Sequence, residues 1–191
     1  MMHHCYVQGG LISSGLSIRQ HLYGYDVRKS DGGAHFDRMG LGPPTHDDFQ
    51  IKTVEVPEPE PGQIQVENVW ISVDPYMRGR MYDRASYAPP YQIGETMQGG
   101  AVGRVSATNH STYKVGDLVR SINGWRTAWT AVPEQSMAMK LPDLDLPESA
   151  FLSVAGMPGF AAYIGLLRIA ELKQDDVVFV SGAAGAVGST V

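Results

Sequence analysis

The chain has 191 residues, of which 43% are hydrophobic and 18% are charged, and its formal net charge is −5. This length and apolar content allow one packed domain, or one domain with part of another, and exclude disorder of the whole chain. The acidic balance argues against a broad basic surface for nucleic acid, and the single cysteine, Cys5, excludes a disulfide framework and a four-cysteine zinc site.

Two further features bear on where the protein works. No apolar stretch is long enough for a transmembrane helix, and the N-terminus lacks the basic and apolar regions of a secretory signal. We therefore expect no membrane partner and a cytoplasmic location, where a lone thiol stays reduced.

Residues 1–40 read differently from the rest of the chain. No helical or strand period there extends beyond one turn. We expect a poorly ordered or misassigned N-terminal extension.

Residues 41–145 have the pattern of a small β domain. Short segments alternate apolar and polar residues between turns rich in glycine and proline, and they contain no long helical period. The expected strands cover residues 49–56, 64–70, 99–105, 118–119, 125–132 and 137–141. This spacing predicts a compact, mainly β barrel or sandwich.

From about Leu146 the period changes. Pro147 and Glu148 suit the start of a helix. A second helix is expected over 160–170, with an apolar side formed by Phe160, Tyr163, Ile164 and Leu167. Residues 177–180 then form a continuous apolar run, which is typical of a strand buried on both faces of a parallel sheet.

A glycine-rich turn follows this run. Against the pattern G-x-G-x-x-G, Ala183 stands at the first position, Gly185 at the second and Gly188 at the third. Glycine at the second position lets the backbone approach a pyrophosphate, and the next helix would direct its free amides at the phosphates. The turn therefore predicts dinucleotide binding, although many tight strand-to-helix turns are also rich in glycine.

Several blocks in the same order resemble one enzyme family. The chain is similar to the zinc-independent medium-chain dehydrogenases/reductases, and within them to the NADPH-dependent alkenal, prostaglandin and curcumin reductases. The blocks that carry the resemblance are 43–49 (PPTHDDF), 59–63 (PEPGQ), 72–81 (SVDPYMRGRM), 86–90 (SYAPP), 99–103 (GGAVG), 156–163 (GMPGFAAY) and 183–188 (AAGAVG). The Asp-Pro-Tyr-Met-Arg and Gly-Met-Pro-Gly blocks are the specific ones.

The resemblance implies a fold, a cofactor and a reaction. The fold is a mainly β GroES-like catalytic barrel over 41–145, followed by linking helices and the first βα unit of a Rossmann domain over 146–191. The cofactor is NADP, bound as NADPH in the cleft between the two domains. Hydride transfer would reduce the C=C bond of an α,β-unsaturated ketone or aldehyde, and the whole enzyme would be a homodimer.

The resemblance also assigns residues. Met157 and Pro158 would lie beside the nicotinamide, and Gly185, Ala186, Val187 and Gly188 would hold the pyrophosphate. Tyr76 would line the substrate side, with Tyr87 as a second candidate for that wall. Arg78 and Arg80 are expected to pair with acids. No metal is expected, because the cysteine and histidine ligands of the zinc-dependent branch have no counterparts here.

Two alternatives stay open. A quinone oxidoreductase would share the fold, and a non-catalytic fragment or interaction module would use the barrel alone. Because only the first βα unit of a nucleotide domain is expected within 191 residues, we expect a fragment that is inactive by itself.

Overall fold

A computed structural model describes residues 7–8, 26–27, 49–50, 54–83, 85–93 and 95–191. Most of the expected N-terminal extension lies outside these residues. Its two described dipeptides are the strands β1 (Val7–Gln8) and β2 (Asp26–Val27). The strand β2 pairs with β3 (Phe49–Gln50), and β1 pairs with the end of the longer strand β4.

The main sheet is antiparallel throughout and is centred on β4 (Ile64–Ile71). One edge of β4 pairs with β5 (Ala101–Thr108), and the other edge pairs with β7 (Ala128–Ala131) and then with β1. The sheet continues through β6 (Leu118–Ser121) to β8 (Met139–Lys140). These strands confirm the β domain that the alternating pattern predicts.

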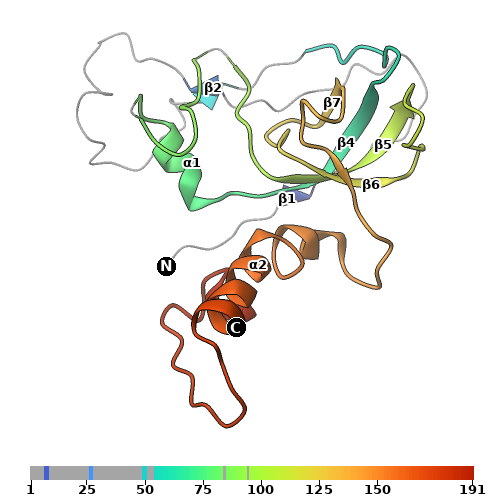
Figure 1. Ribbon diagram of the computed structural model, residues 1–191. Helices are drawn as coiled ribbons and strands as arrows, with labels where there is room; N and C mark the ends of the chain where they lie inside the picture. Colours follow the sequence, from blue (N-terminus) through green and yellow to red (C-terminus); the bar gives the residue numbers. More distant parts are fainter. Residues whose placement is uncertain (1–6, 9–25, 28–48, 51–53, 84, 94) are drawn as a thin grey trace.

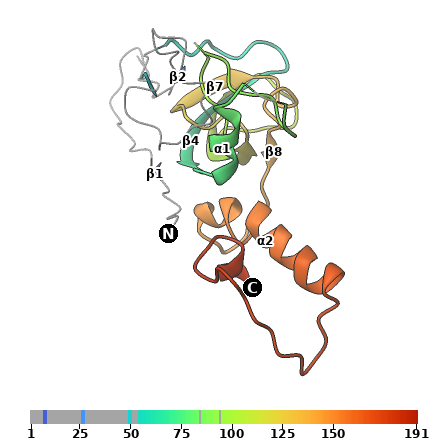
Figure 2. The same cartoon turned by 90° about the vertical axis from the view of Figure 1, so that its left-hand side faces the viewer.

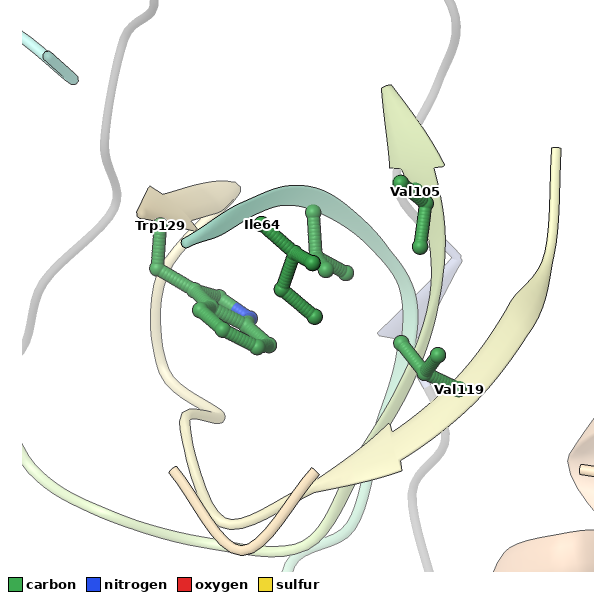
Figure 3. Close-up of a cluster of buried hydrophobic side chains, with 5 residues drawn as sticks. Ile64, Val105, Val119 and Trp129 are labelled. Atoms are coloured by element: carbon green, nitrogen blue, oxygen red, sulfur yellow. The ribbon is translucent and has the colours of Figure 1, made fainter. Parts of the chain in front are cut away.

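The sheet curves around a core of apolar side chains (Figure 3). Ile64 and Val66 come from β4, and the other members come from β5, β6 and β7. The buried members of this core are Ile64, Val66, Val105, Val119 and Trp129. The alternation of β4 thus places every second side chain inside the curve, as a half-buried strand requires.

Gly103 allows β4 and β5 to approach each other closely. A Cβ atom at this position would lie 2.4 Å from the carbonyl oxygen of Glu67 and 2.7 Å from a methyl group of Val66. The pairing shifts register between Asn68 and Trp70, so the ladder is irregular beside this contact. Only glycine fits here without moving the strands.

The outer face of the sheet is covered by the segment that follows β8. The 3₁₀ helix η2 (Glu148–Leu152) places Phe151 and Leu152 against Val102 of β5. Arg104 of β5 also forms an ion pair with Glu148. The helix α2 (Met157–Tyr163) follows η2 and continues as the π-helix η3 (Ile164–Ile169), so that the linking helices lie below the sheet in Figures 1 and 2.

The predicted buried strand over 177–180 is wrong for this structure. These residues belong to no strand, and the side chains of Val177 and Phe179 are 100% and 90% exposed. A parallel strand needs neighbouring strands for its hydrogen bonds and both its faces. The described residues provide no parallel neighbour for 177–180, so the expected first βα unit of a Rossmann domain does not form.

Three further expectations are corrected. Val54 is exposed and residues 54–56 form no strand, because three prolines follow and the segment has no paired neighbour. The expected apolar side of the second helix is also exposed at Phe160, Tyr163 and Leu167, while Ala162 is the residue that α2 buries. Finally, the sequence analysis did not anticipate the helix α1 (Pro75–Arg80).

Candidate functional site

Helix α1 begins at a proline and is fixed to the sheet by its buried methionine. Pro75 occupies the first turn, where its preset backbone angle favours a helix and its lack of an N–H costs nothing. Before it, the Ser72 hydroxyl donates to Asp74 at 2.8 Å, and the Ser72 amide donates to the Gly100 carbonyl at 2.8 Å. Met77 is 3% exposed and lies against Gly99.

This anchoring holds Tyr76 half-buried beside the end of the sheet. Burial, and then the negative charge of Asp74, raise the pKa of the Tyr76 phenol, while Arg80 and a hydrogen bond from the Gly100 backbone act in the opposite direction. The net shift is upward, so the phenol is protonated at neutral pH. Tyr76 can therefore donate a hydrogen bond to an oxygen that becomes negatively charged.

Arg80, at the end of α1, organises the loop that follows. Its Nε donates to the Pro89 carbonyl at 2.8 Å, and its Nη2 donates to the Gln98 side chain at 3.0 Å. The guanidinium also lies 4.2 Å from the centre of the Tyr91 ring. Arg80 thus pairs with no acid in the described part of the chain, contrary to expectation. Its N–H donors are engaged by Pro89 and Gln98, and the face of its guanidinium lies on the Tyr91 ring. Arg78 stacks on Tyr82, with 4.7 Å from guanidinium to ring centre.

Tyr91 closes the other side of this loop. Its hydroxyl donates to the Gln98 carbonyl at 2.7 Å, and its amide donates to the Arg80 carbonyl at 2.7 Å. Burial raises the pKa of the Tyr91 phenol, and the charge of Tyr76 adds to the rise, so the two phenols are electrostatic neighbours.

The loop borders a cleft of about 450 Å³. Its walls come from the end of α1, from residues 89–98 and from the loop before β7. The lining residues with polar side chains include Arg80, Tyr91, Glu95, Gln98, Asn123 and Arg126. A cleft of this size is within the range of small-molecule sites.

The predicted substrate-side residues lie differently around this region. Tyr76 is not among the residues that line the cleft, but it shares α1 with the lining residue Arg80 and interacts electrostatically with the lining residue Tyr91. Tyr87 belongs to the same loop and its charge raises the pKa of Tyr76, but its side chain is 84% exposed. The sequence analysis did not single out Tyr91 or Arg126. Only the return of the loop onto Arg80 shows that Tyr91 belongs here.

The predicted nicotinamide-side residues begin α2. Gly156 precedes the helix, Pro158 occupies its first turn, and Met157 is 67% exposed. Gly156 and Gly159 flank Met157 and Pro158, because the backbone here packs closely against the preceding residues 151–154. A Cβ at Gly156 would lie 2.4 Å from the Phe151 carbonyl oxygen, and a Cβ at Gly159 would lie even nearer to that of Val154.

The predicted pyrophosphate turn is compact. Gly182 has a φ of 68°, the Gly185 amide donates to the Gly182 carbonyl at 2.8 Å, and Gly188 begins the 3₁₀ helix η4 (Gly188–Thr190). A Cβ at Gly185 would meet a single described atom within 4 Å, the Gly182 carbonyl oxygen at 3.1 Å. The backbone at Gly185 is therefore open enough for a pyrophosphate to approach, although its own amide is engaged within the turn.

The described residues show neither a metal-binding cluster nor a membrane-spanning helix. No group of three or more His, Cys, Asp and Glu side chains in the described ranges could hold a metal ion. No described helix has the length and apolar character that a membrane crossing needs.

Comparisons with known proteins agree with this architecture. The family model for the N-terminal domain of oxidoreductase matches residues 34–141. The NADPH-dependent curcumin reductase of Escherichia coli is 42% identical over 150 residues, which cover 78% of this chain and 43% of that protein. Prostaglandin reductase 1 of Bos taurus is 39% identical over 153 residues, which cover 79% of this chain and 44% of that protein.

A solved structure gives the same relationship in three dimensions. CurA from Vibrio vulnificus in complex with NADPH superposes with a TM-score of 0.70 at 40% identity, over 79% of this chain and 44% of that one. The chain thus spans less than half the length of the relatives it matches. Its antiparallel sheet fits a GroES-like N-terminal domain, and the chain belongs to the medium-chain dehydrogenase/reductase family, in the group defined by this oxidoreductase N-terminal domain.

Proposed function

We propose that this protein acts as an NADPH-dependent reductase that saturates the C=C bond of α,β-unsaturated ketones and aldehydes. Support comes from the relatives, which are named NADPH-dependent curcumin reductase and prostaglandin reductase, and from a related structure that holds NADPH. The observation that carries the proposal is the half-buried Tyr76 phenol on α1, the helix whose last residue, Arg80, lines the cleft.

Tyr76 has the chemistry that conjugate reduction requires. NADPH, when bound, supplies a hydride to the β-carbon, and the electron pair of the C=C bond moves onto the carbonyl oxygen as an enolate. A positioned O–H donor stabilises that oxygen as its charge develops, and a proton from solvent or a side chain completes the saturated product at the α-carbon. Tyr76 would donate this hydrogen bond, and Tyr87 would cover the outer wall.

The cofactor residues remain as the sequence predicted them. Gly185, Ala186, Val187 and Gly188 would hold the pyrophosphate, where the open backbone at Gly185 favours close approach. Met157 and Pro158 would lie beside the nicotinamide. The homodimer and the cytoplasmic location also stay predictions.

Steady-state kinetics of the complete product of this gene test the role of Tyr76. With NADPH and 4-phenylbut-3-en-2-one, we expect Tyr76→Phe to lower kcat/KM by roughly ten- to a hundredfold, since it removes a donor to a developing oxyanion. The matched control is Tyr87→Phe, which removes a hydroxyl from an exposed ring and should have a smaller effect. An unchanged kcat/KM for Tyr76→Phe, or no reduction by the parent protein, would contradict the proposal.

A further inference from the structure

Arg126 lies on the wall of the cleft, and the strand β4 holds its backbone in place. The Asn68 side chain donates to the carbonyls of Arg126 at 2.8 Å and Asn123 at 2.7 Å, and accepts from the Trp129 indole at 3.2 Å. The loop before β7 is thereby tied to the middle of the sheet. Arg126 consequently starts from a fixed point at the edge of the cleft.

The guanidinium of Arg126 is held by carbonyls and not by an acid. Its Nε donates to the Gly124 carbonyl at 3.3 Å, and its Nη2 donates to the Thr96 carbonyl at 3.3 Å. In the ranges that the structure describes, the ion pairs are those of Arg104 and Lys140, and Arg126 forms none. Two neutral acceptors thus hold the side chain, and part of its donor capacity stays available to the cleft.

The positive charge of the partly buried Arg126 guanidinium has no anion beside it within the described ranges. Burial lowers the pKa of the Arg126 guanidinium, which means that its desolvation is not offset by a nearby anion. Arg80 adds a second positive charge to the same cleft, although loop contacts occupy its donors. Glu95 is the carboxylate among the lining residues, and it is exposed and makes no ion pair with either arginine within the described ranges.

We propose that Arg126 forms an anion subsite of the cleft, which binds a carboxylate at the end of the enone substrate remote from its C=C bond. This inference rests on the proposed function, and it adds a specificity-determining residue, Arg126, for enones and enals that carry an acid group. A planar guanidinium with free donors favours a carboxylate, and a partly desolvated site strengthens the pairing.

A phosphate of the cofactor is the other anion to consider. The cleft is lined by the end of α1, residues 89–98 and the loop before β7. The predicted pyrophosphate turn at 182–188 belongs to the C-terminal segment, which lies with the linking helices below the sheet in both views (Figures 1 and 2). The position of Arg126 therefore favours the substrate as the source of the anion.

The test compares two substrates that differ in charge but hardly in size. These are 4-phenylbut-3-en-2-one with a para-carboxylate and the same ketone with a para-carboxamide, each reduced by the complete gene product with NADPH. We expect the acid to have a KM about tenfold lower than the amide, as a charge-assisted pair requires. Equal KM values in the parent protein would overturn the inference without any variant.

Variants then assign the preference to one residue. Arg126→Gln should raise the KM of the acid to that of the amide, which removes the preference for the acid, and Arg126→Lys should retain part of it. Arg120→Gln is the matched control, because the Arg120 guanidinium contacts the Met139 sulfur at 3.6 Å and does not line the cleft. An acid preference that survives in Arg126→Gln would place the anion elsewhere.

A binding measurement separates this inference from the proposed function. Benzoate should quench the tryptophan fluorescence of the 191-residue chain in a saturable manner that Arg126→Gln weakens and raised NADPH does not compete away. If neither ketone is reduced but benzoate binds in this way, the reductase proposal fails and the anion subsite stands. Competition by NADPH would assign Arg126 to the cofactor and overturn the carboxylate subsite.

Discussion

Tyr76 and Tyr91 have raised phenol pKa values for the same principal reason, which is burial beside the sheet. The two phenols differ in their contacts. The Tyr91 hydroxyl is committed to the Gln98 carbonyl and its ring to Arg80, so it stiffens the loop. We propose that Tyr76 is the phenol that acts as a donor toward a substrate.

Raised tyrosine pKa values make the protein sensitive to alkali. Above the ordinary value of 10.0, tyrosines of the unfolded chain ionise while Tyr91 stays protonated, so the folded state binds more protons and the free energy of unfolding falls as pH rises. The loss from Tyr91 should be below about 1 kcal/mol near pH 11, because solvent screens a half-buried group. Urea unfolding from pH 9 to about 11 measures it.

The Tyr91→Phe variant isolates this contribution. Phenylalanine cannot ionise, so the decline in stability should become shallower, whereas Tyr87→Phe at an exposed position should leave the slope of the parent protein nearly unchanged. Identical slopes in Tyr91→Phe and the parent protein would show that burial of Tyr91 does not govern the alkaline limb.

Single residues of the site were predictable to different degrees. Tyr76 stands within a specific block, Asp-Pro-Tyr-Met-Arg, so the sequence offered it as a candidate, and its role stays a prediction. The contact of Arg80 with Gln98 joins residues that are 18 positions apart, and no local pattern marks it. Arg126 likewise depends on Asn68, which is 58 positions away. Such positions depend on tertiary contacts and therefore become visible only in the folded chain.

At the scale of elements, alternation predicted the strands whose partners are close at hand. The antiparallel strands β4, β5 and β7 follow the expected segments, and each contributes buried side chains to one core. Residues 177–180 have an equally clear apolar pattern and form no strand, because the described residues offer no parallel partner. An apolar pattern predicts which faces of a segment can be buried. Whether the segment forms a strand depends on neighbouring strands that can pair with it.

The pairing of β4 with β5 yields a test at this scale. Gly103→Ala would place a Cβ 2.4 Å from the Glu67 carbonyl oxygen, so the strands must separate, and we expect a loss of about 2 kcal/mol or more in the free energy of unfolding. Urea unfolding followed by circular dichroism gives the value.

Gly79→Ala is the matched control for this loss. Gly79 lies in α1 with nothing within 4 Å of an added Cβ, and alanine favours a helix over glycine by up to about 1 kcal/mol. This variant should be as stable as the parent protein or more so. Equal stability of Gly103→Ala and the parent protein would mean that the two strands are not packed as closely as described.

At the scale of the whole molecule, the cleft and the linking helices lie in different regions. The cleft is lined by the end of α1, residues 89–98 and the loop before β7. The linking helices lie on the other side, below the sheet in Figure 1. The family follows from the N-terminal domain match at 34–141. We expect the substrate to bind at the described barrel and the cofactor to bind at α2 and the glycine turn.

We propose that the complete gene product transfers a hydride from NADPH to the β-carbon of an enone. Incubation of the complete gene product with 4-phenylbut-3-en-2-one and NADPH that carries deuterium at the nicotinamide C4 position, followed by NMR of the product, tests it most directly. We predict 4-phenylbutan-2-one with deuterium on the carbon that bears the phenyl ring. Deuterium on the carbinol carbon of an unsaturated alcohol would contradict the account.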